Sequence, residues 1–385
     1  MALRCMEALD IEKVFEKFPV VALFHTGGPP SAYCRQNTRL MAGSRSWDSP
    51  EKMPKNKTLI LGVAYEWKDT VENLVSLKPD RMGWPLFQAT EAELDLELDD
   101  WQPRLHRLPS TGLRETLSRK DYLETLWRIQ KHIHRGDIYE INFCMELQAQ
   151  EVKLLPMQLF ENLCYRSPAP MSVLYKWHHL WVVSSSPERF LARRGQRLIS
   201  QPMKGTAPRR AEPLWDAEEM RRLKSSPKER MENTMIVDLV RNDLSRVCQP
   251  GSVRVREWCG LYSFSHVHQM ISTVEGELQP GKTFGDILRA LFPPGSMTGA
   301  PKIRAMQLAE EYETSRRGMY SGTIGFMEKS GDFDLNVVIR SVAYNAQTGL
   351  LSCHVGSAIT HLSQPEQEWE ECLWKAAAIQ SVLNG

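Results

Sequence analysis

The sequence has few of the features that mark a secreted, membrane-bound or nucleic-acid-binding protein. Its 385 residues include 48 basic and 47 acidic side chains, and a formal net charge of +1 gives no attraction to nucleic acid or an anionic membrane. No apolar run approaches the roughly 18 residues needed to cross a bilayer. The N-terminus, MALRCMEALDIEKVF, has acids and lysines where a signal peptide needs an apolar core. We therefore expect a cytoplasmic protein that binds neither nucleic acid nor membrane.

Two common kinds of site are also absent from the sequence. The eight cysteines form no C-x-x-C pair and no zinc-like spacing with histidine, which is typical of thiols in a reducing compartment. The glycine-rich stretch near residue 295 lacks the spacing of a nucleotide P-loop. What remains is the composition of a globular protein, with 42% hydrophobic and 25% charged residues. The length allows one large domain or two ordinary ones.

Hydrophobic periodicity predicts a mixture of strands and helices. Helical spacing predicts helices over 118–137 and 228–244, two helices around a Gly/Pro-rich turn within 283–313, and a last helix over 363–383. Pro301 is expected in the first turn of its helix and Ser363 at an N-cap. The stretch 180–207 predicts two antiparallel strands with Gly195 at the turn. Further strands are predicted at 18–28, 57–69, 91–101, 138–150, 320–327, 333–344 and 350–360.

A lysine stands on a rigid turn in the stretch QPMKGTA, residues 201–207. Pro202 fixes one backbone angle, and Gly205 lets another group approach the main chain closely. Lys204, between them, is therefore well placed to be presented to a pocket, although a solvated loop side chain is the commoner interpretation of a single lysine. In a hairpin-like arrangement of 180–207, Glu188 faces the same pocket.

Two pairs of glutamates form a candidate metal site. Glu229 and Glu232 lie at i and i+3 on one predicted helix, and Glu368 and Glu371 on another, so each pair shares a helix face. The small residues at 295–299 precede a helix whose N-terminus offers N–H groups to a carboxylate or phosphate. This combination suggests Mg²⁺ held by carboxylates and water, against the commoner interpretation of surface charges.

Nine motifs stand in a fixed order along the chain: GDIYEINFC, SSSPERFL, QPMKGTAPR, ENTMIVDLVRNDL, HQMISTVEG, PPGSMTGAPKIRAM, RRGMYSGTIGF, DLNVVIRSV and PEQEWEEC. In this order they resemble the chorismate-utilising enzymes, which include anthranilate synthase component I, aminodeoxychorismate synthase component I, and the isochorismate and salicylate synthases. The resemblance is strong over 117–380. It implies an α/β fold of the α+β type, with two packed antiparallel sheets and helices outside. We expect an N-terminal region over 1–110, packed on the same fold, and a chorismate-binding catalytic domain over 111–385.

The resemblance also implies Mg²⁺ as cofactor and chorismate, a dicarboxylate, as substrate. Glu232 and Glu371 resemble the direct metal ligands, with Glu229 and Glu368 assisting through water. Glu188 resembles the general acid that protonates the departing 4-hydroxyl. The implied substrate-binding groups are Thr206 beside the ring and, around a substrate carboxylate, Ser296, Tyr320, Arg340 and the backbone at Gly356.

The lysine at position 204 distinguishes branches of this family. The sequence there resembles the aminodeoxychorismate synthases, whereas the anthranilate and isochorismate enzymes carry alanine. The resemblance implies that Lys204 attacks C2 of chorismate and that ammonia then enters at C4, which requires a neutral amine. Two positions depart from the family pattern. Glu140 stands where glutamine or lysine is usual, and Gln269 where histidine is common; His268, one residue earlier, is expected on the opposite strand face.

The implied partners follow from what the chain does not contain. No glutamine-hydrolysing domain and no pyridoxal-phosphate lyase domain is recognisable in the sequence. We therefore expect ammonia from solution or from a separate glutamine amidotransferase subunit, and a separate aminodeoxychorismate lyase that completes 4-aminobenzoate synthesis for folate. Two alternatives stay open: an anthranilate synthase component I, and a non-catalytic chorismate-binding subunit.

Overall fold

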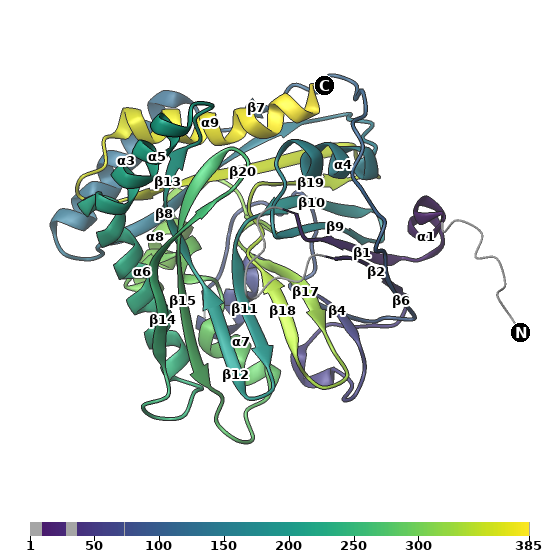
Figure 1. Cartoon of the computed structure of the whole chain (residues 1–385). Helices are drawn as coiled ribbons and strands as arrows, with labels where there is room; N and C mark the ends of the chain where they lie inside the picture. Colours follow the sequence, from purple (N-terminus) through teal and green to yellow (C-terminus); the bar gives the residue numbers. More distant parts are fainter. Residues whose placement is uncertain (1–9, 28–36, 73, 385) are drawn as a thin grey trace, which may run out of the picture.

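The computed structural model describes residues 10–27, 37–72 and 74–384 of the chain. Most of the N-terminal stretch that argues against a signal peptide lies outside these residues. In the described ranges no helix has the length and apolar character needed to cross a membrane. Two antiparallel sheets pack together with helices on their outer faces, and the strands of the two sheets run in different directions (Figure 1). This arrangement confirms the predicted fold class.

The first sheet joins strands from the whole length of the chain. Its order is β16 (Gly299–Ala300), β8 (Glu140–Ala149), β20 (Leu350–Ile359), β19 (Ser341–Asn345), β10 (Leu180–Ser186), β9 (Met171–Trp177), β1 (Val20–His25), β2 (Thr38–Gly43) and β6 (Leu94–Glu97), with β7 (Arg114–Glu115) beside β8. Its long apolar strands β8 and β20 bury side chains on both faces, as expected of a sheet covered on both sides.

The second sheet has a similar composition and carries the predicted lysine stretch at one edge. Its order is β13 (Met203–Pro208), β15 (Val267–Glu277), β12 (Arg197–Gln201), β11 (Arg189–Arg194), β18 (Phe333–Asn336), β17 (Thr323–Met327), β4 (Leu59–Val63), β5 (Phe87–Glu91) and β3 (Ser46–Trp47), with β14 (Arg254–Ser263) beside β15. Strands from before residue 110 thus extend both sheets: β1, β2 and β6 in the first, and β3, β4 and β5 in the second.

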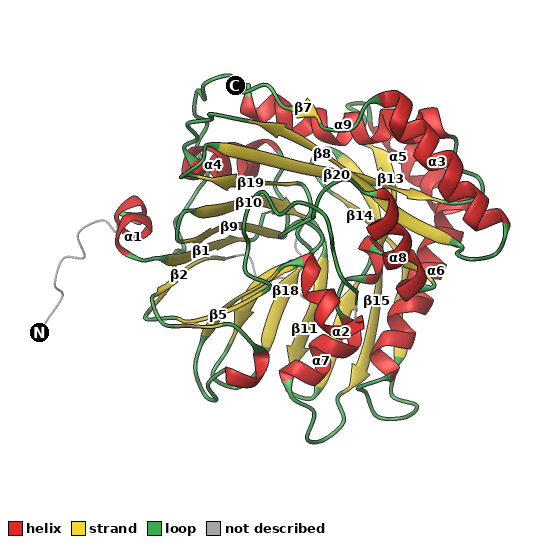
Figure 2. Cartoon of the chain, turned by 180° about the vertical axis from the view of Figure 1, so that it is seen from behind, coloured by secondary structure: helices red, strands yellow, loops and turns green. Residues whose placement is uncertain are grey.

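Helices cover the outer face of each sheet (Figure 2). The first sheet is covered by α3 (Arg119–His134), α4 (Pro156–Arg166), α8 (Lys302–Tyr312) and α9 (Pro365–Leu383), whose apolar faces share one core with it. The second sheet is covered by α5 (Pro213–Ser225), α6 (Pro227–Ser245) and α7 (Phe284–Leu291). Shorter elements are α1 (Ile11–Lys17), η1 (Pro50–Lys52), η2 (Tyr65–Lys68), α2 (Asp69–Glu72) and η3 (Gly295–Met297).

Part of the core between the sheets is an apolar cluster among the N-terminal strands. Val20 and Met41 of the first sheet and Ile60 and Ile324 of the second belong to one buried cluster. Burial of side chains of this size contributes roughly 1.5–3 kcal/mol each. Another part of the interface is polar, and the candidate site lies there.

The chain passes between the sheets at two places that the sequence analysis did not predict. The stretch 180–207, predicted as two strands, forms four: β10 belongs to the first sheet, and β11, β12 and β13 belong to the second. The stretch 333–344, predicted as one strand, divides into β18 and β19 in different sheets. The two crossings are joined by backbone hydrogen bonds, since Val337 N donates to Glu188 O (2.9 Å) and Ser185 N to Arg340 O (3.1 Å).

Two predicted helix starts are also corrected. Pro301 is the N-cap of α8, not a residue of its first turn, because the helix begins at Lys302. α9 begins at Pro365 with Gln364 as its N-cap. Ser363 instead accepts a hydrogen bond from Thr360 N (3.1 Å) and so closes the preceding turn.

Candidate active site

A cavity of about 580 Å³ opens between the ends of the two sheets and helices α6 and α9. It brings together all the residues that the sequence analysis singled out as catalytic, substrate-binding or metal-binding. They are Glu188, Lys204, Thr206, Glu229, Glu232, Ser296, Tyr320, Arg340, Gly356, Glu368 and Glu371. Side chains separated by more than 180 positions in the sequence thus line one cavity.

Local backbone geometry directs Lys204 into this cavity. The pairing of β13 with β15 changes register between Met203 and Thr206, and such an irregularity re-aims the side chains it contains. Gly205 has φ +89°, a conformation that favours glycine. A Cβ atom at Gly205 would lie 3.2 Å from Cβ of Glu229, so the missing side chain lets α6 approach the lysine strand.

Lys204 forms a buried ion pair with Glu140. Its Nζ donates to Glu140 Oε1 at 2.7 Å, and the two side chains are 11% and 1% exposed. Burial alone lowers the pKa of Lys204, but the negative charges of Glu140, Glu232 and Glu188 outweigh it and the net pKa is raised. The sequence left this balance open; in the structure the surrounding carboxylates favour the charged form of the lysine.

Glu188 lies at the first chain crossing, where both sheets bury it. Ser296 donates a hydrogen bond from Oγ to Glu188 Oε1 at 2.6 Å. Burial raises the pKa of Glu188 to about 7, while the bond from Ser296 and the charge of Lys204 act in the opposite direction. A carboxyl group with this pKa is suited to donate a proton near neutral pH.

The four glutamates predicted to hold a metal face the cavity from two helices. Glu229 and Glu232 project from α6, and Glu368 and Glu371 from α9. Burial raises the pKa of Glu229, of Glu368 and, to about 7, of Glu232. Glu371, whose side chain is 48% exposed, lies at the rim.

This carboxylate set fits Mg²⁺ but does not form a complete cage. Across the described ranges, no three acidic, histidine or cysteine side chains lie close enough to hold a metal ion by themselves. Mg²⁺ usually takes one or two protein carboxylates and completes its shell with water and substrate oxygens. The donors are therefore of the right chemistry, and water or substrate must supply the remaining ligands.

Positively charged and hydroxyl groups line the opposite part of the cavity. Arg340, at φ +49°, occupies the second chain crossing. Burial lowers its pKa, but an arginine side chain stays charged in proteins. The Tyr320 ring stacks on His354 with centroids 5.5 Å apart. Gly356 O accepts from Lys375 Nζ (2.7 Å), so part of this backbone position is already bonded.

Strand alternation places Gln269 at the cavity and His268 away from it, as expected. Gln269 accepts a hydrogen bond from Thr206 Oγ1 (3.0 Å) and donates one to Gly205 O (2.9 Å). His268 is fully buried and bonds to Ser263 and Asp216. The N-terminus of α8, predicted as an anion site, does not line this cavity. Ser296 and Met297 of the preceding turn line it, whereas Lys302, the first residue of α8, pairs with Asp243 (2.9 Å).

Several cavity residues were not identified from the sequence. Lys228 lies 3.9 Å from Glu232, and Lys375 lies 2.7 Å from Glu371, each at i,i+4 spacing. This spacing is a sequence signal that was available, because residues four apart share a helix face. His354 had no such signal, since its bonds to Ser315 and Ser352 depend on the packing of the sheets.

The part of the chain that forms the cavity is similar to known proteins. A family model described as "chorismate binding enzyme" matches residues 88–381, more than half of the chain, and spans every residue of the cavity lining. The chain belongs to the chorismate-binding enzyme family.

Relatives within the chorismate-binding enzyme family are more than one third identical to this chain over the residues that align. It is 40% identical over 275 residues to "Aminodeoxychorismate synthase component 1" of Klebsiella aerogenes, which covers 71% of this chain and 60% of the relative. It is 35% identical over 289 residues to the protein of the same name in Escherichia coli, covering 75% and 63%. The chain therefore matches less than two thirds of the length of these relatives.

Solved structures of the family have the same fold. The menaquinone-specific isochorismate synthase of Escherichia coli superimposes with a TM-score of 0.80 at 14% identity, covering 98% of this chain and 92% of that one. Anthranilate synthase component I of Streptococcus pneumoniae gives a TM-score of 0.76 at 22% identity, covering 97% and 86%. At these identities the likeness concerns the fold alone.

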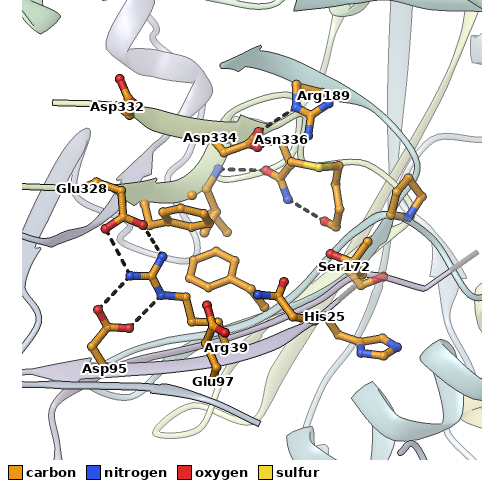
Figure 3. A pocket seen from close by; sticks show the side chains of 18 of the residues that line it. His25, Arg39, Asp95, Glu97, Ser172, Arg189, Glu328, Asp332, Asp334 and Asn336 are labelled. Carbon is orange, nitrogen blue, oxygen red and sulfur yellow. Dashed lines mark hydrogen bonds and ion pairs between the residues drawn. The ribbon is translucent and has the colours of Figure 1, made fainter. Parts of the chain in front are cut away.

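A second cavity of about 530 Å³ lies between the sheets, on the side of the N-terminal strands (Figure 3). Arg39 crosses it, bonding to Asp95 at 2.7 Å and to Glu328 at 2.5 Å, and so links strands of both sheets. Arg189 bonds to Asp334 at 2.7 Å on the opposite wall.

Proposed function

We propose that this chain aminates chorismate at C4 to give 4-amino-4-deoxychorismate, with Mg²⁺ as cofactor. The proposal rests on the position of Lys204. This lysine lines the same cavity as Glu188, the predicted general acid, and the four glutamates predicted to bind the metal. The relatives named aminodeoxychorismate synthase component 1 support the same activity.

In this proposal the substrate is held at both of its carboxylates. Arg340 binds one carboxylate with its planar pair of N–H donors, assisted by Tyr320, Ser296 and the backbone near Gly356. Thr206 lies beside the ring. Lys204 forms a bond to C2 while Glu188 donates a proton to the departing 4-hydroxyl. Ammonia then adds at C4, and the lysine leaves.

Glu232 and Glu371 would hold Mg²⁺ directly, and Glu229 and Glu368 would do so through water. The ion, when bound, supplies the positive charge that joins these carboxylates to the other carboxylate of chorismate. In the structure Lys228 pairs with Glu232 and Lys375 pairs with Glu371. When Mg²⁺ binds, each lysine would either move away from its glutamate or stay in contact with the carboxylate oxygen that does not bind the metal.

Ammonia would come from a separate glutamine amidotransferase subunit or from solution. The product would pass to a separate aminodeoxychorismate lyase that forms 4-aminobenzoate for folate synthesis. The charge and cysteine usage of the chain support a cytoplasmic reaction of small molecules.

Product analysis tests this function. The chain is incubated with chorismate, ammonium and Mg²⁺, with and without an aminodeoxychorismate lyase, and the products are separated by liquid chromatography. We expect 4-aminobenzoate only when the lyase is present. Fluorescent anthranilate formed without lyase would identify an anthranilate synthase instead. Binding of chorismate with no turnover would identify a non-catalytic subunit.

A further inference from the structure

Glu140 contacts the reactive nitrogen of Lys204 from the protein side of the cavity. It is the first residue of β8, and its side chain is 1% exposed. Its Oε1 accepts from Lys204 Nζ at 2.7 Å. Lys204 lines the cavity, and Glu140 does not belong to the lining. The carboxylate therefore lies behind the amine with respect to the space where substrate would bind.

The position of Glu140 is fixed by the backbone around it. Its strand pairs with β16, where Ala300 lies opposite Glu140, and Tyr139 N donates to Ala300 O at 2.7 Å. Gly299 approaches so closely that a Cβ atom there would lie 2.1 Å from Glu140 O. Little movement is open to this segment, so the distance between carboxylate and amine is maintained by the fold.

The second oxygen of Glu140 is free of hydrogen bonds from the residues that the structure describes. Within this part of the chain, Oε2 is buried and accepts no hydrogen bond. Glu146 Oε2 and Glu275 Oε2 share this feature, but in the described ranges neither carboxylate contacts an amine that lines the cavity. An unoccupied lone pair beside an ammonium group is what a proton acceptor requires.

We propose that Glu140 is the base that removes a proton from the Lys204 ammonium group and later returns it. This inference rests on the proposed amination, because it concerns the activation of its nucleophile. Glu188 and Glu232 also act on the lysine by their charge, but the 2.7 Å hydrogen bond joins it to Glu140. Glu140 is thus a catalytic residue that contacts the reacting atom.

The proton balance closes over one turnover. Lys204 Nζ gives a proton to Glu140, and its lone pair forms the N–C2 bond while the two ring double bonds shift from C1=C2 and C5=C6 to C1=C6 and C4=C5 and the C4–O bond breaks. Glu188 protonates the hydroxyl, which leaves as water. Ammonia then bonds to C4, both double bonds shift back, and the C2–N bond breaks to release neutral Lys204. Glu140 returns its proton to the lysine, and Glu188 takes one from the new C4 ammonium group.

Replacement of Glu140 by glutamine separates this role from a purely electrostatic one. Glu140→Gln keeps a hydrogen-bond acceptor near Lys204 but removes the base. We expect kcat with chorismate and ammonium to fall about 10²- to 10⁴-fold at neutral pH, the usual scale for loss of a general base. The KM for chorismate should stay within about twofold, and kcat should recover as pH rises because hydroxide then deprotonates the lysine.

The opposite result would overturn the inference. If Glu140 only keeps Lys204 charged, its removal leaves more neutral amine, and Glu140→Gln would turn over as fast as the wild type or faster. Asp243→Asn is the matched control, because Asp243 forms a buried ion pair with Lys302 (2.9 Å) outside the cavity lining. We expect it to change stability while kcat stays unchanged.

A shorter carboxylate provides an independent test if Glu140→Gln does not fold. Glu140→Asp keeps the negative charge but lengthens the 2.7 Å contact, so formation of the lysine adduct, followed by intact-protein mass spectrometry, should slow at least about tenfold. Adduct formation at the wild-type rate would reject the role of Glu140. The proposed function fails separately, if the wild-type chain itself yields no aminodeoxychorismate.

Discussion

Gly205 offers a direct test of whether backbone geometry positions the lysine strand against α6. In Gly205→Ala the new Cβ must adopt φ +89° and lies 3.2 Å from both Cβ and Oε2 of Glu229. A left-handed conformation costs a non-glycine residue about 1–2 kcal/mol, and overpacking adds about 1–3 kcal/mol. We expect the free energy of unfolding to fall by about 2–5 kcal/mol. We expect kcat to fall several-fold, because a 3.2 Å contact is relieved by a shift of a few tenths of an ångström, less than the 1 Å that costs about 10²-fold.

Gly281→Ala is the matched control for this experiment. Gly281 has φ +82° in the turn between β15 and α7, and a Cβ atom there would meet no heavy atom within 4 Å in the described structure. It carries the same backbone strain without the contact, so we expect a loss of about 1–2 kcal/mol and unchanged kcat. Urea unfolding measures the first quantity and chorismate consumption the second. Equal stability losses in the two variants, with wild-type turnover in Gly205→Ala, would refute the role given to the close approach.

Three further predictions concern the proposed chemistry. Lys204→Ala should lower amination by several orders of magnitude and abolish the covalent adduct in intact-protein mass spectra, because no other amine takes its place; undiminished turnover would exclude the covalent route. Glu371→Gln should raise the half-saturating Mg²⁺ concentration at least about tenfold, whereas Glu370→Gln, exposed on the same helix, should not; equal magnesium titrations would place the metal elsewhere. Burial raises the pKa of Glu188 from 4.5 to about 7, so its contribution to stability is complete below pH 4.5 and is lost as pH rises through about 7. Glu188→Gln should therefore remove up to about 3 kcal/mol of the difference in unfolding free energy between pH 4.5 and pH 8, and an unchanged difference would contradict the raised pKa.

The motif residues could be predicted from the sequence because their spacing is local. Glu229 and Glu232 share a helix face by i,i+3 spacing alone, and α6 and α9 form where helical periodicity predicts them. Pro202 and Gly205 likewise marked an irregular backbone around Lys204, but the predicted turn was wrong, because the lysine lies in strand β13 at a change of register. That these segments meet in one cavity followed from the family resemblance, since no local pattern specifies contacts over more than 100 residues.

The chain crossings and the lysine environment could not be predicted in this way. The residues on either side of Glu188 and Arg340 predict strands, but a strand pattern does not state which sheet a strand joins. The bond between Glu140 and Lys204 joins residues 64 positions apart, and the pKa of Lys204 depends on three carboxylates brought together by the fold. Ser363 was predicted as an N-cap because its residue type suits one; its hydroxyl bonds to Thr360 instead.

The strands contributed by the first 110 residues have a consequence for how the protein can be divided. β1 pairs with β9 in the first sheet, and β4 pairs with β17 in the second. A fragment that begins at residue 111 would expose β9 and β17 as long bare edges, each with unpaired N–H and C=O groups and an apolar face. Such edges recruit strands from other molecules. Because the strands before residue 111 cover both edges, we expect a fragment without them to aggregate.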